Sequence, residues 1–386
     1  MASSTNGQEK RKITRRRFLK YAVLSLAALG LGGGLHLRSD KFGASPEGER
    51  LARILASPNY RDGQFRNYEP FLPPDPQYKN AFWPSMKRFL LPDKGDNIPA
   101  EPIPTVKTDF HALPRTKNAV CWLGHSTVYF QLDGLRMLLD PVFTRYAAPV
   151  PGIIRAFDGT EIYTPADIPD LDVLLLTHDH WDHLDYGTVS ALHPRTKQLI
   201  CPLGVGAHLE QWGVPAAKIT ELDWYDSCTP ATGLRVTLTP TRHFSGRLLK
   251  RNQTLWGGFA LELAHRRVFI SGDGGYGKHF KEIGARFGGF DLALMECGQY
   301  NMAWHNVHLL PEETAQATAD IRAKKVIPMH AGKYCISYHQ WRDPYERLSS
   351  AAKKHQNHWQ LLTPRLGEQV EPDLSTAFPA WWEGRQ

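Results

Sequence analysis

Residues 174–185, LLLTHDHWDHLD, constrain the fold more than any other part of the 386-residue chain. Three histidines and two aspartates fall within residues 178–183, directly after the apolar run LDVLLLT. A continuous apolar run of this length is typical of a strand buried on both faces. In an extended segment residues i and i+2 point to the same side, so His178 and His180 converge on one point. If a helix follows, Asp182 and His183 turn toward a second point beside the first.

Three interpretations fit this stretch alone: a metal site, an acid–base cluster, or a polar loop that is rich in histidine by chance. Imidazole nitrogens and carboxylate oxygens suit Zn²⁺ or a similar divalent ion. The stretch also lies just past the carboxyl end of a predicted buried strand, where open α/β sheets usually bind ligands.

Four more short polar sites follow strand-like apolar runs. They are His243 in TPTRHFSG, Asp273 in VFISGDGGYG, His308 in NVHLLPEE and His330 in VIPMHAG. One histidine at a strand end is usually structural, but several at consecutive strand ends indicate one cavity lined by several loops. The sequence therefore favours a metal site.

The surrounding pattern predicts a mixed α/β fold. AVCWLGHSTVYFQLDGLRMLLDPV reads as three short strands with turns at Gly124 and at Asp133-Gly134. Further strands are expected at residues 198–201, 235–239, 257–263, 267–271, 291–295 and 325–328, with helices at 186–192, 277–287 and 311–323. The last helix has Pro311 in its first turn with acids beside it, a helix start signal.

The excess positive charge of the chain is confined to its first 38 residues. Eight Lys/Arg and one acid there give +7, which is the net charge of the whole chain, so the remainder is neutral. A neutral body excludes a basic face for nucleic acid. The segment KRKITRRRFLKYAVLSLAALGLGGG joins a basic run to an apolar stretch that is short for a membrane span. It resembles a bacterial twin-arginine export signal, with a basic amphipathic anchor as the alternative.

These observations predict four regions: a signal or anchor at 1–38, a Pro-rich irregular segment packed on the core at 39–117, the main domain at 118–370 and a tail at 371–386. Eleven of the 28 prolines lie between Pro58 and Pro114, which argues against regular sheet or long helix there. The five cysteines are scattered without a C-x-x-C pair, so buried thiols and at most one disulfide are expected.

The motif order His-x-His-x-Asp-His, lone His, Gly-Asp and late His resembles the metallo-β-lactamase superfamily. Within it, WLGHSTVYFQLDGLRMLLDPVF, LLLTHDHWDHLDYGTV, ELDWYDSC, GDGGY, EIGARFGGFDLAL and HLLPEE resemble the phospholipase D enzymes that hydrolyse N-acyl-phosphatidylethanolamine. The resemblance runs from about Trp83 to Tyr338. It implies an αββα sandwich with the site at one edge of the two sheets.

The resemblance also implies a site with two divalent ions, zinc in the first place and manganese or iron as alternatives. His178, His180 and His243 would hold the first ion, Asp182, His183 and His330 the second, with Asp273 bridging both. A shared water of lowered pKa would attack the substrate, so Asp182, Asp273 and His308 are the expected catalytic residues, with His308 near the substrate phosphate. Asp185 is expected to orient a ligand histidine, His125 to lie behind the ligands or serve packing, Tyr276 to line the pocket and Asp140 to be structural.

The sequence departs from the phospholipases at residues 295–301, MECGQYN, where Glu296 adds a carboxylate that could repel a phosphodiester. The expected function is a phosphodiesterase acting on phospholipid-like or small phosphodiester substrates at the periplasmic side of a bacterial inner membrane. The alternatives are a lactonase or related ester or amide hydrolase, and a non-catalytic metal-binding protein of the cell envelope. A membrane surface and a second copy of the chain stay open as partners.

Overall fold

The computed structural model describes residues 39–73, 96–150, 152–247, 250–354 and 359–385. The expected export signal and the aromatic residues Phe82 and Trp83 lie outside the described residues. In the part of the chain that is described, no helix has both the length and the apolar character to cross a membrane.

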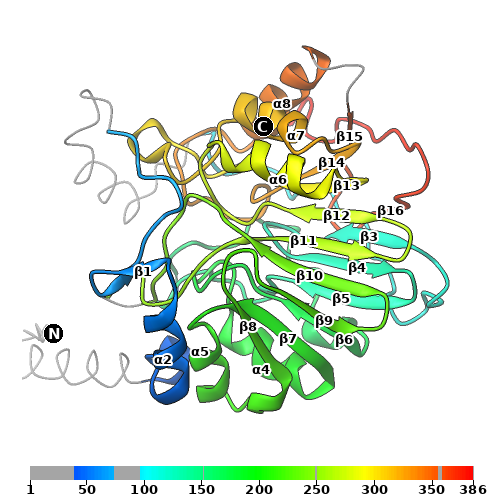
Figure 1. The fold of residues 1–386 in the computed structure, drawn as a ribbon. Helices are drawn as coiled ribbons and strands as arrows, with labels where there is room; N and C mark the ends of the chain where they lie inside the picture. Colours follow the sequence, from blue (N-terminus) through cyan, green and yellow to red (C-terminus); the bar gives the residue numbers. More distant parts are fainter. Residues whose placement is uncertain (1–38, 74–95, 151, 248–249, 355–358, 386) are drawn as a thin grey trace, which may run out of the picture.

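Two seven-stranded sheets form the centre of the molecule (Figure 1). The first sheet has, in spatial order, β16 (Gln369–Val370), β3 (Ala119–Trp122), β4 (Val128–Leu132), β5 (Leu135–Leu139), β6 (Leu171–Leu175), β7 (Thr196–Pro202) and β8 (Ile219–Leu222). The second has β9 (Ser227–Ala231), β10 (Leu234–Thr239), β11 (Gly258–Leu263), β12 (Arg267–Ile270), β13 (Leu292–Glu296), β14 (Lys325–Met329) and β15 (Gln360–Leu361).

Both sheets share one pairing pattern. Read in the orders above, the first three pairs of each sheet are antiparallel and the last three are parallel. The second sheet is continuous in the chain, whereas the first is completed by β16, which returns from the C-terminal end to pair with β3. The expected site residues follow the carboxyl ends of β6 in the first sheet and of β10, β12, β13 and β14 in the second. These strand ends lie on the same side of the sandwich.

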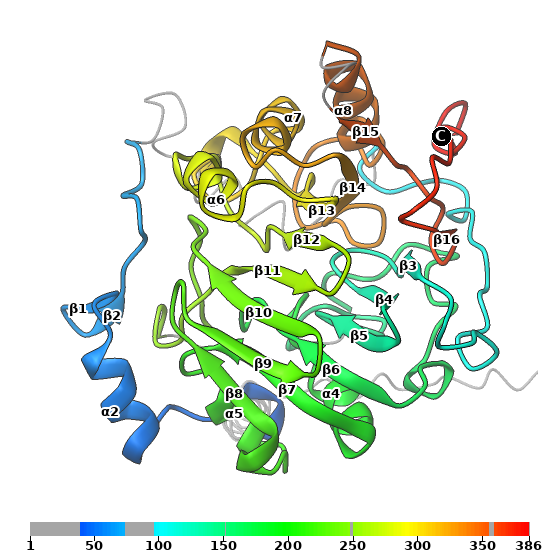
Figure 2. The same ribbon diagram turned by 45° about the vertical axis from the view of Figure 1, so that its right-hand side comes forward.

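Helices cover the outer faces of the sheets (Figure 2). The second sheet is covered by α6 (His279–Phe287), α7 (Pro311–Asp320) and α8 (Asp343–Lys354), and the first by α4 (Tyr186–Leu192) and α5 (Gly206–Gln211). Along β13, Leu292 and Leu294 belong to the core between the sheets, while Ala293 and Met295 pack with the helices. Burial on both faces explains why this strand reads as a continuous apolar run. The fold is the expected αββα sandwich.

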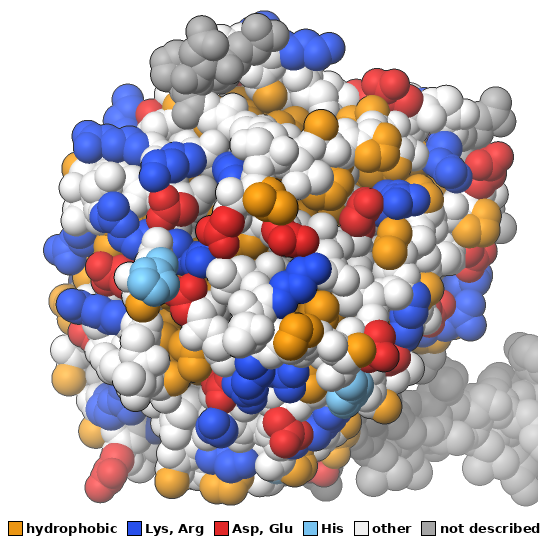
Figure 3. Space-filling model, turned by 90° about the vertical axis from the view of Figure 1, so that its right-hand side faces the viewer, with side chains coloured by type: hydrophobic (Ala, Val, Ile, Leu, Met, Phe, Trp, Pro, Cys, Tyr) orange, Lys and Arg blue, Asp and Glu red, His pale blue; other side chains and the backbone are white. Residues whose placement is uncertain are grey.

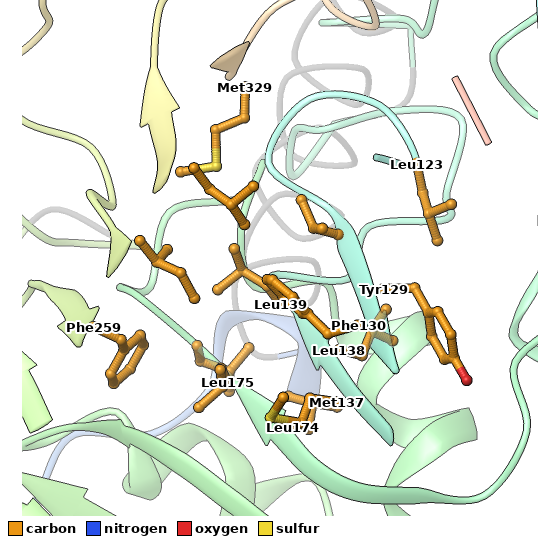
Figure 4. Close-up of a cluster of buried hydrophobic side chains, with 14 of the residues drawn as sticks. Leu123, Tyr129, Phe130, Met137, Leu138, Leu139, Leu174, Leu175, Phe259 and Met329 are labelled. Atoms are coloured by element: carbon orange, nitrogen blue, oxygen red, sulfur yellow. The ribbon is translucent and has the colours of Figure 1, made fainter. Parts of the chain in front are cut away.

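Apolar side chains are buried on both faces of the first sheet (Figure 4). Leu138 and Leu139 of β5 and their partners Leu174 and Leu175 of β6 are fully buried, and neighbours along a strand point to opposite faces. Phe259 of the second sheet belongs to the same buried cluster. Fully burying one such side chain stabilises the fold by about 1.5–3 kcal/mol. The β4–β5 hairpin turns at Asp133 (φ 49°) and Gly134 (φ 81°), the positive-φ pair that a two-residue hairpin requires.

Every strand and helix expected from residue 118 onward is present, including α4 with its expected bounds. The segment expected to be irregular is not entirely so. It contains η1 (Asp40–Phe42), the helix α2 (Gly48–Ala56) and a hairpin of β1 (Tyr60–Arg61) and β2 (Gln64–Phe65). The helix forms because residues 47–56 contain no proline. Within the described ranges, the remaining one-turn helices are η3 (Pro165–Asp167), η4 (His193–Arg195), η5 (Ala216–Lys218) and η6 (Met302–Trp304).

All five cysteines are free thiols, three of them buried. On the face shown in Figure 3, Lys/Arg and Asp/Glu side chains are interspersed, which agrees with the neutral charge of residues 39–386.

Candidate metal centre

The candidate metal centre lies where the two sheets present the carboxyl ends of their strands. The loop of residues 178–183, called the metal loop below, follows β6 of the first sheet. The second sheet contributes His243 after β10, Asp273 after β12, His308 after β13 and His330 after β14. Side chains from both sheets thus meet at one edge of the sandwich.

The first group of potential ligand atoms comes from His178, His180 and His243. His180 Nδ1 lies 2.9 Å from His178 Nε2 and 3.2 Å from His243 Nε2. The ring of His178 is held through Nδ1 by the Thr177 hydroxyl at 3.0 Å, and His243 Nδ1 donates to the Val307 carbonyl at 3.0 Å. These contacts direct each Nε2 toward the shared point. Burial, together with the neighbouring histidines, holds the pKa of His178 and His243 well below the usual value, so both rings are neutral and can offer lone pairs.

The second group consists of Asp182, His183 and His330, with His125 beside them. His183 Nε2 lies 3.6 Å from Asp182 Oδ2, and the His183 and His330 rings stack with centroids 5.1 Å apart. His330 adopts φ 66°, and its N–H donates to the His125 carbonyl at 2.9 Å. The backbone thereby fixes the late histidine at the edge of the β3–β4 loop.

Asp273 lies between the two groups. Its Oδ2 is 3.1 Å from His183 Nε2 and 3.9 Å from both His178 Nε2 and His243 Nε2, and its Oδ1 is 3.2 Å from His330 Nδ1. One carboxylate therefore faces ligand atoms of both groups, as a bridging ligand does.

The residues present fit divalent ions. His183 Nε2 and Asp273 Oδ1 are buried and have no hydrogen-bond partner among the described residues. A buried polar atom without a partner is costly in a folded protein, and a bound cation would satisfy both atoms. All seven ligands expected from the sequence lie in these groups. The nitrogen and oxygen donor set suits zinc and leaves manganese or iron open.

Asp140, and not Asp185, orients a ligand histidine. Asp140 Oδ2 accepts from His183 Nδ1 at 2.8 Å and from the Thr177 hydroxyl at 2.6 Å. The Asp185 carboxylate instead caps α4, accepting from the Thr188 N–H at 2.8 Å, and also takes the Thr144 hydroxyl. The expected role of Asp185 is therefore wrong, because a carboxylate at the first turn of a helix is taken by the free backbone N–H groups. The interpretation of Asp140 as merely structural is also corrected.

Glu296 does not line an open pocket wall. It is fully buried, its Oε2 accepts from the Gly274 N–H at 2.6 Å, and its Oε1 contacts His308 Nδ1. Burial and the negative charge of Asp273 raise the pKa of Glu296 well above its usual value. The expected repulsion of a phosphodiester is therefore not supported, since the carboxylate lies behind His308 and favours the protonated form. The His308 ring stacks on the His330 ring at 5.2 Å with an interplanar angle of 18°.

His125 and Tyr276, the two remaining residues expected near the site, have different surroundings. His125 Nε2 lies 2.8 Å from Asp182 Oδ2, so this ring stands behind a candidate ligand, as expected. Tyr276 stacks on Phe280 with ring centroids 6.0 Å apart and donates its hydroxyl to Asp320 of α7. Tyr276 therefore joins α6 to α7, and its expected place in the substrate pocket stays a prediction.

Sequence reasoning missed several residues that support the site, among them Ser126, which lies 3.1 Å from His330 Nδ1. Asp140 carried a usable signal, because it follows the apolar strand β5 just as the other site residues follow their strands. Gln299 carried none: its side chain donates to the His330 and Tyr334 carbonyls, contacts that only the folded chain creates.

Comparison with known proteins gives the family. The sequence model of the Beta-lactamase superfamily domain matches residues 135–331. A protein of Mycobacterium tuberculosis is 37% identical over 337 residues, covering 84% of this chain and 87% of that one. The N-acyl-phosphatidylethanolamine-hydrolyzing phospholipase D 1 of Caenorhabditis elegans is 33% identical over 265 residues, covering 63% of this chain and 72% of that one.

Solved structures agree on the fold. Igni18, a metallo hydrolase from Ignicoccus hospitalis, superimposes with a TM-score of 0.50 at 20% identity, over 66% of this chain and 97% of that one. The sequence model matches about half of this chain, and the chain covers 72% of the Caenorhabditis relative. The chain therefore belongs to the metallo-β-lactamase superfamily and is a metal-dependent hydrolase.

Proposed function

We propose that the chain is a binuclear metal-dependent phosphodiesterase of the phospholipase D type, acting on phospholipid-like substrates. The observation that carries the proposal is Asp273, whose carboxylate faces both groups of candidate ligands. The named function of the Caenorhabditis relative supports the substrate class.

Two divalent ions at this site would lower the pKa of a shared water and neutralise the charge that develops on the substrate. The residues of the chain supply the rest. Asp182 and Asp273 balance the positive charge, and the His125 ring holds Asp182 in place. His308 faces the same space from the second sheet. The Glu296 carboxyl contacts its Nδ1 and favours the protonated form, so it can donate to Nδ1 and leave the ring proton on Nε2. Nε2–H would then hydrogen-bond a substrate oxygen or pass its proton to the leaving group.

The test is a hydrolysis assay on protein of measured metal content, using bis(p-nitrophenyl) phosphate, a phospholipid and a lactone side by side. We expect phosphodiester turnover with about two ions per chain, and its loss in His180→Ala. Turnover of the lactone alone would establish the lactonase alternative. Two tightly held ions without turnover on any substrate would identify a metal-binding protein instead.

We also propose that the chain works at the periplasmic side of a bacterial inner membrane, after export by the twin-arginine route. The motif TRRRFLK at residues 14–20 supports this. Replacing both Arg15 and Arg16 by lysine should leave the protein in the cytosol, as cell fractionation would measure. Unchanged fractionation would contradict the export route without touching the proposed chemistry.

A further inference from the structure

The metal loop is held from behind through Asp179. In the extended part of the loop, Asp179 points away from the side taken by His178 and His180. Its carboxylate accepts from the Gly246 N–H at 2.7 Å and from the Thr254 hydroxyl at 2.9 Å, and it lies 3.3 Å from His208 Nε2. Fixing this side chain fixes the directions in which its two neighbours point.

Arg247 holds the backbone of the same loop. Its side chain is buried, and Nη1 donates to the carbonyls of Asp179 at 2.9 Å and Leu184 at 2.7 Å, which bracket the loop. The guanidinium also lies 3.9 Å from the centroid of the Trp181 ring. One planar group with several donors thus links both ends of the loop and the indole between them.

The third support comes from residues 40–44, which we call the strap. The Lys41 carbonyl accepts from Arg247 Nη2 at 2.8 Å, and the Ala44 N–H donates to His208 Nδ1 at 3.1 Å. That donation leaves the His208 proton on Nε2, where it faces Asp179. The Phe42 ring meets Trp181 edge-on, with centroids 5.1 Å apart. The strap therefore reaches the metal loop by three routes, although it lies more than 130 residues away in sequence.

We propose that the strap, acting through Arg247 and His208, positions the metal loop, so that metal affinity depends on residues that ligate no metal. This inference rests on the proposed metal centre. Contacts that orient ligands typically change metal affinity tenfold to a hundredfold when they are lost. The same range is expected here, because the strap fixes the segment that carries four of the seven candidate ligands.

A pair of glycines gives a matched test. Gly43 has φ +73°, and a Cβ there would lie 2.0 Å from His208 Nδ1 and 2.6 Å from its Cγ. Gly63 has φ +74°, and a Cβ there would meet nothing within 4 Å. Both substitutions place a side chain at a similar positive φ, but only Gly43→Ala brings it against His208. Because Gly43 also has ψ −162°, a conformation nearly confined to glycine, the arginine pair below separates backbone strain from displacement of His208.

The measurement is the rate at which each full-length variant loses zinc to a chromophoric chelator, together with the absorption spectrum of the cobalt-substituted protein. We expect Gly43→Ala to lose metal about tenfold to a hundredfold faster, with an altered cobalt spectrum, and Gly63→Ala to match the wild type. Equal rates and spectra for the two variants would overturn the inference. A wild type that binds no metal would overturn the proposed function as well, so the two failures are distinguishable.

A second pair keeps the test decisive if Gly43→Ala does not fold. Arg247→Lys keeps the charge but loses the planar fork. Arg266→Lys is the control, because it changes an arginine with a side chain only 9% exposed that pairs with Asp133 and Asp373 and not with the metal loop. Faster metal loss in Arg247→Lys alone supports the inference. Equal loss in both, which general loosening of the fold would produce, contradicts it.

Discussion

At the scale of single residues, the sequence predicts the candidate metal ligands but not the side chains that orient them. His178, His180 and His183 were predictable because spacing and strand end place them together. The carboxylates that orient them were not. Asp140 and Asp185 both stand beside an apolar segment, yet one binds His183 and the other caps α4. Their roles depend on which donors the folded backbone leaves free, and the spacing of residues does not specify that.

Asp140→Asn should weaken the second metal position. An amide can present its NH₂ to His183 Nδ1, which removes the acceptor that orients this ring, so metal affinity should fall about tenfold to a hundredfold. Titration of the metal-free protein with zinc would measure it. Asp185→Asn is the control: asparagine caps helices about as well as aspartate, so both the stability and the metal stoichiometry should stay unchanged. The reverse pattern would restore the sequence-based interpretation.

Glu296→Leu should lower kcat about tenfold to a hundredfold while both metals stay bound. The substitution removes the hydrogen-bond partner that orients His308 and leaves the Gly274 N–H buried and unpaired, at about 1–3 kcal/mol of stability. Glu296→Gln keeps an oxygen for the Gly274 N–H and an NH₂ group for His308 Nδ1, so it should restore part of kcat. Steady-state kinetics and metal analysis of the two variants would decide it, and an unchanged kcat in the leucine variant would rule out a positioning role for Glu296.

At the scale of elements, the strands buried on both faces were predictable because their apolar runs are continuous. The strands that were missed are short or lie at the edges of the sheets. β15 and β16 have two residues each, and β9 contains Pro230, which an edge strand tolerates. α8 places its buried residues Tyr345, Leu348 and Ala351 among charged neighbours, so its apolar face is thin. Such elements are stabilised by pairing with a neighbouring strand or packing on the sheet, and not by a strong pattern of their own.

The contact between residue 69 and α6 should make stability depend on acid. Burial alone would raise the pKa of Glu69, but hydrogen bonds from the His279 ring and from the Lys278 and His279 backbone lower it to about 2. The unfolded value is about 4.3. Because the pKa is lower in the folded state, the contact stabilises the fold at pH values above the unfolded-state pKa. This contribution is lost as the pH falls through the folded-state pKa.

Glu69→Gln lacks this titration. The difference in Tm between wild type and variant should be constant at neutral pH and shrink toward zero between about pH 4.3 and pH 2. Thermal melts across this range would measure it. A difference that does not change with pH would show that the contact adds no pH-dependent stability.

At the scale of the whole molecule, the candidate metal centre joins two sheets whose facing sides pack as an apolar core. The metal loop belongs to the first sheet, while His243, Asp273 and His330 belong to the second. Bound ions would therefore connect the two layers of the sandwich as well as serve the chemistry.

Removing the metals should lower the Tm of the full-length protein. Ligand that binds only the folded state adds about 2.7 kcal/mol per site at a free concentration of 100 times Kd. Scanning fluorimetry with a chelator and with graded zinc should give a Tm that rises with each tenfold increase in free zinc, and less so for His180→Ala. Identical melting with chelator and with zinc would contradict a metal that spans both sheets.

The pairing of β16 with β3 implies that the first sheet is completed late in synthesis. Val370 pairs with Val120, so the first sheet stays one strand short until nearly the entire chain has left the ribosome. The metal loop emerges early, but His330 and the strand that completes its supporting sheet emerge late. We therefore expect metal uptake to follow synthesis, and ribosome-stalled chains that end before residue 369 should retain less zinc than released chains.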